Sequence, residues 1–213
     1  MTPAEQSQTA LAMCQMAPVI PVLVIDDLAH AVPLAQALVA GGLPVLEVTL
    51  RTDCALEAIT AMAQVEGAVV GAGTVLTPDQ MAEARTAGAR FAVAPGATPA
   101  LIDAARLNKM PLLPGAQTCS EVMTLLELGY TVQKFFPAEA IGGAAALKSI
   151  AGPLPQVTFC PTGGISAARA SDYLALANVA CVGGSWVAPK DAMNAGAWDT
   201  ITKLAADAAR LPR

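Results

Sequence analysis

Short apolar runs rich in β-branched residues alternate with alanine-rich amphipathic segments along the whole chain. About eight such pairs recur at intervals of about 20–25 residues, which is the spacing of βα units. The apolar runs are hydrophobic at nearly every position, as in parallel strands that are covered on both faces. Strands are expected at residues 19–25, 45–50, 69–75, 91–94, 111–114, 131–136, 156–160 and 179–182. The alternation predicts an α/β protein with parallel strands.

Helices are expected between the strands, and their ends carry recognisable signals. Thr77-Pro78 and Thr98-Pro99 each place an N-cap residue before a proline in the first turn. Gly41, Gly88 and Gly129 are expected to end helices in the left-handed conformation. The expected helices cover residues 28–41, 54–65, 78–88, 99–108, 119–129, 143–151, 166–176 and 191–210, and another precedes the first strand, from about Pro3 to Met16.

Two architectures accommodate this pattern, a closed (β/α)8 barrel and an open doubly wound sheet. A dinucleotide-binding open sheet carries Gly-x-Gly-x-x-Gly after its first strand, but Ile25-Asp26-Asp27-Leu28 stands there instead. Polar residues, glycine or proline recur at the carboxyl ends of most strands, which form the active-site face of a barrel. We therefore expect a single (β/α)8 TIM barrel domain over residues 1–213, with residues 1–17 as an additional N-terminal helix packing on the barrel.

Composition narrows the classes of partner. The chain is 54% hydrophobic and 14% charged, and its net charge of −5 comes with no cluster of Lys or Arg. These values argue against nucleic acid or an anionic membrane surface as a partner. The apolar runs are far shorter than the roughly 20 residues of a membrane span. Residues 1–8 contain Glu5 and no basic residue, unlike a secretory signal.

The cysteines and the single histidine indicate the cellular compartment of the protein and whether it holds a metal ion. The five cysteines are odd in number and include no CxxC pair, so we expect reduced thiols in a cytoplasmic protein. His30 is the only histidine, whereas divalent-metal enzymes of sugar chemistry commonly use several. We therefore expect no metal site and no cofactor.

Lys134 is the most informative residue, because it lies within the expected buried strand Val132-Gln133-Lys134-Phe135-Phe136. An amine held in apolar surroundings loses its proton more readily, and the neutral form is a nucleophile for carbonyl groups. The alternative is a lysine that reaches solvent or pairs with a carboxylate.

The segment Leu46-Glu47-Val48-Thr49-Leu50-Arg51 supplies a polar face. The two-residue period of a strand places Glu47, Thr49 and Arg51 on one side, facing the barrel interior, and the apolar residues on the other. Glu47 is then able to pair with Lys134 or shuttle protons, and Arg51 to hold a carboxylate. The alternative is a buried Glu–Arg ion pair without chemistry.

Glycine-rich turns follow three strands. Gly71-Ala72-Gly73-Thr74 ends the third, which brings a hydroxyl to the site. Thr162-Gly163-Gly164 follows the seventh strand and Gly183-Gly184-Ser185 the eighth, where phosphate-binding barrels hold a phosphate with backbone N–H groups. Ordinary turns are the alternative in each case.

Four segments together resemble the 2-dehydro-3-deoxy-phosphogluconate aldolase / 4-hydroxy-2-oxoglutarate aldolase family. They are residues 42–51 (GLPVLEVTLR), 70–75 (VGAGTV), 134–139 (KFFPAE) and 159–165 (FCPTGGI). The resemblance covers nearly the whole chain. It implies a class I, Schiff-base aldolase that cleaves 2-dehydro-3-deoxy-6-phosphogluconate to pyruvate and glyceraldehyde 3-phosphate in the Entner–Doudoroff route, with 4-hydroxy-2-oxoglutarate as a second substrate. It also implies a homotrimer without metal.

The same resemblance implies a role for each matching residue. Lys134 corresponds to the Schiff-base lysine and Glu47 to the general acid/base. The implied substrate contacts are Arg51 and Thr74 for the pyruvate carboxylate, Pro95 and Phe136 for the walls, Thr162 for the substrate hydroxyls, and Gly163, Gly164 and Ser185 for the phosphate.

Two other functions stay open on the residues alone. One is a phosphate-binding barrel isomerase or epimerase, which acts by proton transfer and needs no trapped lysine. The other is a non-catalytic sugar-phosphate binding protein, in which a lysine inside the barrel has no purpose.

Overall fold

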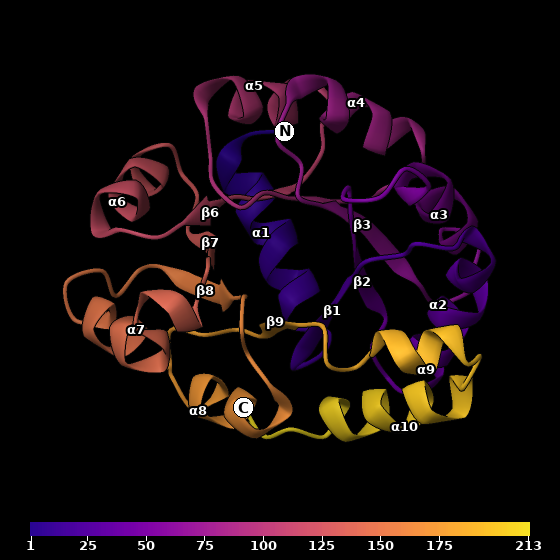
Figure 1. Ribbon diagram of the computed structural model, residues 1–213. Coiled ribbons are helices and arrows are strands. Elements are labelled where there is room, and N and C mark those ends of the chain that lie inside the picture. The colour runs from indigo at the N-terminus through magenta and orange to yellow at the C-terminus, as the bar shows by residue number, and fades with distance from the viewer.

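The computed structural model describes residues 1–213, and all of its paired strands are parallel (Figure 1). Six strands form one ladder in the order β5-β4-β3-β2-β1-β9, and three form a second in the order β6-β7-β8. The strands are β1 (Val19–Leu23), β2 (Val45–Thr49), β3 (Val69–Gly73), β4 (Ala92–Val93), β5 (Leu112–Leu113), β6 (Gly115–Ala116), β7 (Val132–Phe135), β8 (Thr158–Pro161) and β9 (Val182–Gly184). The predicted parallel α/β class is confirmed.

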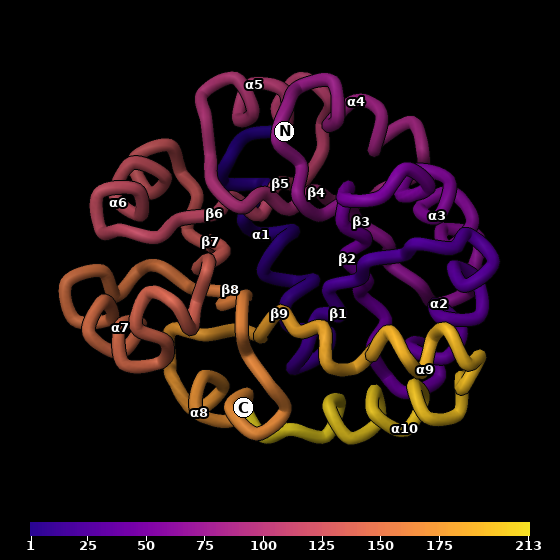
Figure 2. The backbone as a smooth tube through the Cα atoms, viewed as in Figure 1, coloured from indigo at the N-terminus to yellow at the C-terminus, as the bar shows by residue number.

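The helices α2 to α10 lie around the outside of the strands (Figures 1 and 2). They are α2 (Ala31–Ala40), α3 (Ala55–Met62), α4 (Pro78–Thr86), α5 (Pro99–Leu107), α6 (Cys119–Glu127), α7 (Gly143–Ala151), α8 (Ala167–Leu174), α9 (Lys190–Asn194) and α10 (Trp198–Ala209), with α1 at Pro3–Cys14 and short 3-10 helices η1 (Leu28–His30) and η2 (Glu139–Ile141). None of these helices has both the length and the apolar character needed to cross a bilayer.

The strands divide the apolar residues into two clusters. Leu46 and Val48 of β2 belong to the larger cluster, which packs the strands against the outer helices. Val45 faces the other way, into a smaller inner cluster, and Glu47 and Thr49 follow it at the two-residue period. The inner cluster consists of Ala10, Cys14, Ile20, Val45, Phe91, Val93, Leu113, Val132, Cys160 and Cys181.

Helix α1 packs against the amino ends of β5 and β7 through two buried polar side chains. The Oε1 atom of Gln6 accepts hydrogen bonds from the Leu112 N–H at 3.2 Å and from the Tyr130 hydroxyl at 2.9 Å. Burial raises the pKa of Tyr130 to about 12, so its hydroxyl stays protonated as a donor. Ser7 Oγ accepts from the N–H groups of Thr131 and Val132. The expected N-terminal helix is therefore present and is fixed by directional contacts.

The two ladders come close at both of their ends. Pro114 is the single residue between β5 and β6, and its carbonyl accepts a hydrogen bond from the N–H of Lys134. At the other junction, isolated bridges pair Phe159 with Val179 and Thr162 with Gly183. One junction between the ladders is thus interrupted by Pro114, and the other is joined only by isolated bridges.

The last strand was expected at residues 179–182 but is β9, Val182–Gly184. The predicted bounds are wrong because the ladder with β1 depends on the two glycines. A Cβ on Gly183 would lie 2.2 Å from Thr162 Oγ1, and one on Gly184 would lie 1.9 Å from the Trp186 ring. These glycines allow close approach inside a strand, where the sequence pattern indicated only a turn.

Three details of the predicted helices are also wrong. The segment 28–41 begins as η1 and becomes α-helical only at Ala31, with Pro33 in its first turn. Gly41 has a right-handed φ of −78°, and the left-handed residue is Gly42. The segment 191–210 is two helices, α9 and α10, separated at Gly196, whose φ is +62°. The N-caps Thr77 and Thr98 are confirmed, because both side chains accept a backbone hydrogen bond.

Replacing Gln6 tests whether α1 is held by these polar contacts. Gln6→Ala leaves the Leu112 N–H and the Tyr130 hydroxyl buried without their acceptor, so the free energy of unfolding should fall by at least about 2 kcal/mol. Gln8→Ala, at an exposed position of the same helix, should change it by less than about 0.5 kcal/mol. Urea unfolding of both variants makes the comparison, and equal effects would contradict the account.

Candidate active site

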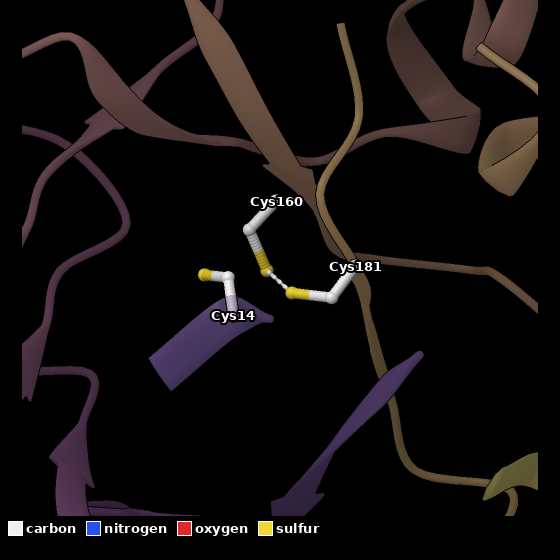
Figure 3. A group of neighbouring side chains, drawn as sticks. All are labelled: Cys14, Cys160 and Cys181. Atoms are coloured by element: carbon white, nitrogen blue, oxygen red, sulfur yellow. Dashed lines mark hydrogen bonds between the residues drawn. The ribbon is translucent and has the colours of Figure 1, made fainter. Parts of the chain in front are cut away.

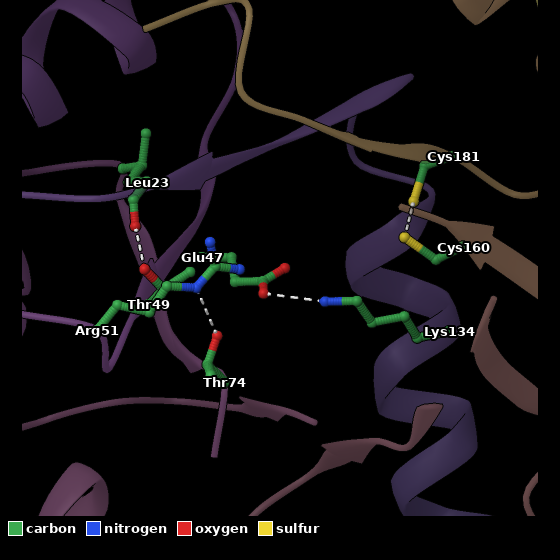
Figure 4. Close-up of polar contacts among 8 residues, drawn as sticks. All are labelled: Leu23, Glu47, Thr49, Arg51, Thr74, Lys134, Cys160 and Cys181. Atoms are coloured by element: carbon green, nitrogen blue, oxygen red, sulfur yellow. Dashed lines mark hydrogen bonds and ion pairs between the residues drawn. The ribbon is translucent and has the colours of Figure 1, made fainter. Parts of the chain in front are cut away.

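A buried ion pair lies between β7 and β2. The Nζ atom of Lys134 is 3.2 Å from Oε1 of Glu47, and their side chains are only 5% and 4% exposed. The two side chains point toward each other from opposite sides of the interior (Figure 4). Of the two possibilities that the sequence left for Glu47, pairing with Lys134 or shuttling protons, the structure shows the pairing. The arrangement sets an amine beside a carboxylate that is able to accept its proton.

Neighbouring glycines make room for the pair. A Cβ on Gly73 of β3 would lie 2.3 Å from Glu47 Oε1, so the carboxylate occupies the space of the missing side chain. Gly115, the register partner of Lys134, has no room for a side chain, because a Cβ there would lie 2.3 Å from the backbone of Pro95. Pro95, expected as a wall of the site, therefore contacts the strand next to the lysine.

Arg51 lies beyond the carboxyl end of β2, on the same side as Glu47. Its Nε atom donates to Oγ1 of Thr74 at 3.2 Å, so two predicted carboxylate contacts lie side by side (Figure 4). Thr74 has a positive φ of 58°, an uncommon conformation for a threonine. Arg51 is exposed and makes no ion pair with any carboxylate of the chain. Its guanidinium is therefore available to an anion.

Phe136 directly follows β7, and its ring lies next to Lys134. Its ring centroid is 5.3 Å from the Nζ atom of Lys134, within the range of a cation–π contact. The ring is half-buried, and its Cδ2 atom would lie 3.3 Å from a Cβ on Gly163. Phe136, expected as a wall of the site, thus lies between Lys134 and the loop after β8.

The loop after β8 combines a buried hydroxyl with free backbone donors. Thr162 is 6% exposed, and its Oγ1 atom has no hydrogen-bond partner. Gly163 and Gly164 have φ values of +108° and +78°, a region that favours glycine. Their N–H groups donate no hydrogen bond within the chain, and neither does that of the exposed Ser185 after β9. Because β8 and β9 approach through the Thr162–Gly183 bridge, these donors belong to neighbouring loops.

Glu139 supports the loop after β8 from behind. A Cβ on Gly164 would lie 2.9 Å from Cβ of Glu139, so the two backbones pack closely. The Tyr173 hydroxyl donates to the Glu139 carboxylate. Burial, reinforced by this carboxylate, raises the pKa of Tyr173 well above its ordinary value. The tyrosine therefore remains a neutral donor that fixes Glu139. Sequence analysis did not identify this support. Glu139 ends the segment 134–139 that carries the family resemblance, but no spacing connects it with Tyr173.

Three interior cysteines were also missed. Cys14, Cys160 and Cys181 are the only group of three His, Cys, Asp or Glu side chains placed to hold a metal ion. They are far apart in the sequence, so no spacing motif joins them. Their inward-facing positions, two residues before Thr162 and Gly183 in the case of Cys160 and Cys181, were the available signal.

Comparisons with known proteins agree with this fold and site. A family model described as KDPG and KHG aldolase matches residues 11–204. The KHG/KDPG aldolase of Escherichia coli (strain K12) is 59% identical over 192 residues, which cover 90% of each chain. The 2-keto-3-deoxy-6-phosphogluconate aldolase of Zymomonas mobilis ZM4, solved with 3-phosphoglycerate, is 51% identical with a TM-score of 0.92, covering 97% of this chain and 98% of that one.

A further solved structure bears on the chemistry. The KDPG aldolase from Legionella pneumophila, with pyruvate captured as a covalent carbinolamine intermediate, is 48% identical. Its TM-score is 0.91, and the match covers 93% of this chain and 97% of that one. Fold, site and relatives together define an α/β carbon–carbon lyase of the aldolase type. The chain belongs to the KDPG and KHG aldolase family.

The buried pair predicts a strong energetic coupling between Lys134 and Glu47. Glu47→Gln or Lys134→Met alone leaves one buried charge unpaired, which should lower the free energy of unfolding by about 3–5 kcal/mol. The double variant leaves no charge, so its loss should be smaller than the sum by well over 1 kcal/mol.

The exposed pair Arg106–Asp103 offers a matched control. Its side chains are 56% and 62% exposed, so the same cycle with Arg106→Met and Asp103→Asn should show a coupling of at most about 1 kcal/mol. Urea unfolding of all variants gives both coupling energies. Additive losses at Lys134 and Glu47 would mean that their charges do not sense each other.

Proposed function

We propose that this chain cleaves 2-dehydro-3-deoxy-6-phosphogluconate to pyruvate and glyceraldehyde 3-phosphate through a Schiff base on Lys134. The observation that carries the proposal is the buried pair of Lys134 and Glu47 beside an unpaired arginine. The names of the relatives support the substrate, and the carbinolamine in the Legionella pneumophila aldolase supports the covalent route. We also propose 4-hydroxy-2-oxoglutarate as a second substrate, since the Escherichia coli relative is a KHG/KDPG aldolase.

The first half of the reaction makes the imine. Lys134 transfers a proton to Glu47 across their 3.2 Å contact and becomes the free amine. The amine attacks the C2 ketone of the substrate and forms a carbinolamine. Glu47 then returns the proton to the carbinolamine hydroxyl, which leaves as water, and a protonated imine remains.

The second half breaks the carbon–carbon bond. The protonated imine withdraws electrons from the C3–C4 bond, while Glu47 removes the proton of the C4 hydroxyl through a water molecule. Glyceraldehyde 3-phosphate departs and leaves an enamine of pyruvate on Lys134. Protonation at C3 and addition of water to the imine release pyruvate and restore the lysine. No metal or cofactor is needed, because the imine is itself the electron sink.

Binding groups at the carboxyl ends of the strands fit the two anionic ends of the substrate. Arg51 and Thr74 take the carboxylate beside the imine, since the arginine has no carboxylate partner of its own. The free N–H groups of Gly163, Gly164 and Ser185 take the phosphate, and 3-phosphoglycerate in the Zymomonas mobilis aldolase supports a phosphorylated ligand. The unsatisfied Thr162 hydroxyl faces the substrate hydroxyls, and Pro95 and Phe136 form the walls.

The same proposal extends to the whole molecule. Two observations support a closed (β/α)8 barrel: only Pro114 separates β5 from β6, and isolated bridges link the segment around β8 to the segment around β9. The chain would then be a single domain, with residues 1–17 as the helix at the amino ends of the strands. We further propose a cytoplasmic homotrimer that acts in the Entner–Doudoroff route, with small molecules as its partners and no nucleic acid or membrane.

The alternatives considered from the sequence lack a comparable observation. An isomerase or epimerase acts by proton transfer alone and leaves an amine paired with the catalytic carboxylate unexplained. A non-catalytic binding protein leaves the same buried pair without a purpose, and the family is one of aldolases.

Two substitutions test whether the phosphate and the carboxylate of the substrate bind at separate places. A side chain at Gly163 would block the phosphate site, but it would also disturb the segment after Lys134, because a Cβ there would lie 3.1 Å from Cα of Pro137. Ser185 is therefore the better position for the test. Ser185 is exposed, and Ser185→Glu sets a negative charge against the phosphate. It should lower kcat/KM for the phosphorylated substrate at least about tenfold, or about 1.4 kcal/mol, with little change for 4-hydroxy-2-oxoglutarate. Ser185→Gln, neutral and of similar size, is the control.

Arg51→Ala should lower kcat/KM for both substrates by about 30-fold or more, or about 2 kcal/mol, because both present a carboxylate beside the imine. Release of pyruvate is measured for both substrates with each variant. Equal losses on both substrates for Ser185→Glu would place the phosphate elsewhere. Absence of pyruvate from the unmodified protein with either substrate would overturn the proposed function.

A further inference from the structure

Three cysteine side chains lie close together in the interior that the strands surround, on the side away from the groups proposed to bind substrate. Cys14 is the last residue of α1, Cys160 lies on β8, and Cys181 directly precedes β9 (Figure 3). They are only 1%, 2% and 0% exposed, and all are free thiols. Their sulfur atoms lie within 4.8 Å of one another, and those of Cys160 and Cys181 are 3.5 Å apart.

The spacing of the sulfur atoms suits a shared centre. With a thiolate–metal bond of about 2.3 Å, two sulfurs on one centre lie about 3.5–4 Å apart. Cys160 and Cys181 already have this separation. The Cys14 sulfur lies within 4.8 Å of the other two, so it needs to approach by roughly 1 Å, a displacement of the size that rotation about its χ1 angle produces. Sulfur ligands select soft ions over magnesium or calcium.

The surroundings of the three cysteines determine which net charge and coordination number a bound centre is able to have. The three cysteines belong to the inner apolar cluster with Ala10, Ile20 and Val132 among its members. No fourth His, Cys, Asp or Glu ligand joins them. Three thiolates around a trivalent centre form a neutral complex, whereas a divalent or monovalent ion leaves one or two negative charges. Burying such a charge among apolar side chains is costly, so the trivalent centre is favoured.

We propose that Cys14, Cys160 and Cys181 form a binding site for a soft, three-coordinate trivalent metalloid of the arsenite class. Arsenous acid, As(OH)3, reacts with three thiols, so that three As–S bonds replace three As–O bonds. Each thiol proton leaves with a hydroxide as water, giving three waters and no change of oxidation state. The bound centre links α1 to β8 and β9, and therefore stabilises the folded state in which the three sulfurs meet.

This site is distinct from the proposed catalytic groups, although it is close to them. Cys160 is the register partner of Lys134, and one residue separates it from Thr162. Arg51 and Thr74 lie across the interior from Cys160 and Cys181 (Figure 4). None of the three thiols takes part in the proposed imine chemistry. Binding of a metalloid at the three cysteines is therefore independent of the reaction at Lys134.

Native mass spectrometry with sodium arsenite tests the site. The reduced protein is equilibrated with arsenite in the folded state and also during dilution out of urea, so that burial does not bar entry. The expected product carries one arsenic per chain, with a mass gain of one arsenic atom less three hydrogens. X-ray absorption should show three sulfur neighbours, and the melting temperature should rise.

Matched variants assign the ligands. Cys54→Ser/Cys119→Ser removes the two cysteines outside the cluster and should bind as the unmodified chain does. Cys14→Ala should lose the three-sulfur product and the rise in melting temperature, and circular dichroism checks that it folds. An arsenic that keeps a hydroxyl in the unmodified chain would show binding by two thiols and overturn the proposal. So would the absence of bound arsenic after both treatments, or its loss in the Cys54→Ser/Cys119→Ser variant.

Discussion

Lys134 and Glu47 place opposite charges 3.2 Å apart in a region from which solvent is nearly excluded. Moving either charge out of water costs several kcal/mol, and only the partner and a rigid geometry offset that cost. The surrounding residues serve this geometry. Gly73 leaves space for the carboxylate, and Gly115 lets Pro95 close against the strand that pairs with Lys134. The chemistry of the site therefore depends on glycines that have no reactive group.

The polarity of the interior changes from one end of the strands to the other. Towards their amino ends it is apolar, and α1 covers that end with Gln6 and Ser7 bonded to strand backbones. Towards their carboxyl ends it becomes polar, with the ion pair, the Thr162 hydroxyl and the free N–H groups of the glycine turns. Because side chains alternate, the strands that bury apolar residues against the outer helices also present these groups inward. Fold and site thus use opposite faces of the same strands.

Much of this organisation follows from local rules. The two-residue period of residues 45–49 predicts that Glu47 faces inward, and the proline-bearing turns at Thr77 and Thr98 predict helix starts. The last strand was placed too early, because glycines that permit a close approach look like turn residues in a sequence. The cysteine cluster was not foreseen, since its members come from the end of a helix, from a strand and from the residue before another strand. Such contacts depend on how elements pack, which no local spacing records.

The central claim is that Lys134 forms a covalent imine with the keto acid. Incubation with pyruvate and borohydride, followed by digestion and peptide mass analysis, tests it most directly. The account predicts a single reduced pyruvyl group, located on the peptide that contains Lys134, and none in a Lys134→Met variant that retains its fold. Labelling at another lysine such as Lys148 or Lys190, or no labelling while the protein still cleaves its substrate, would contradict it.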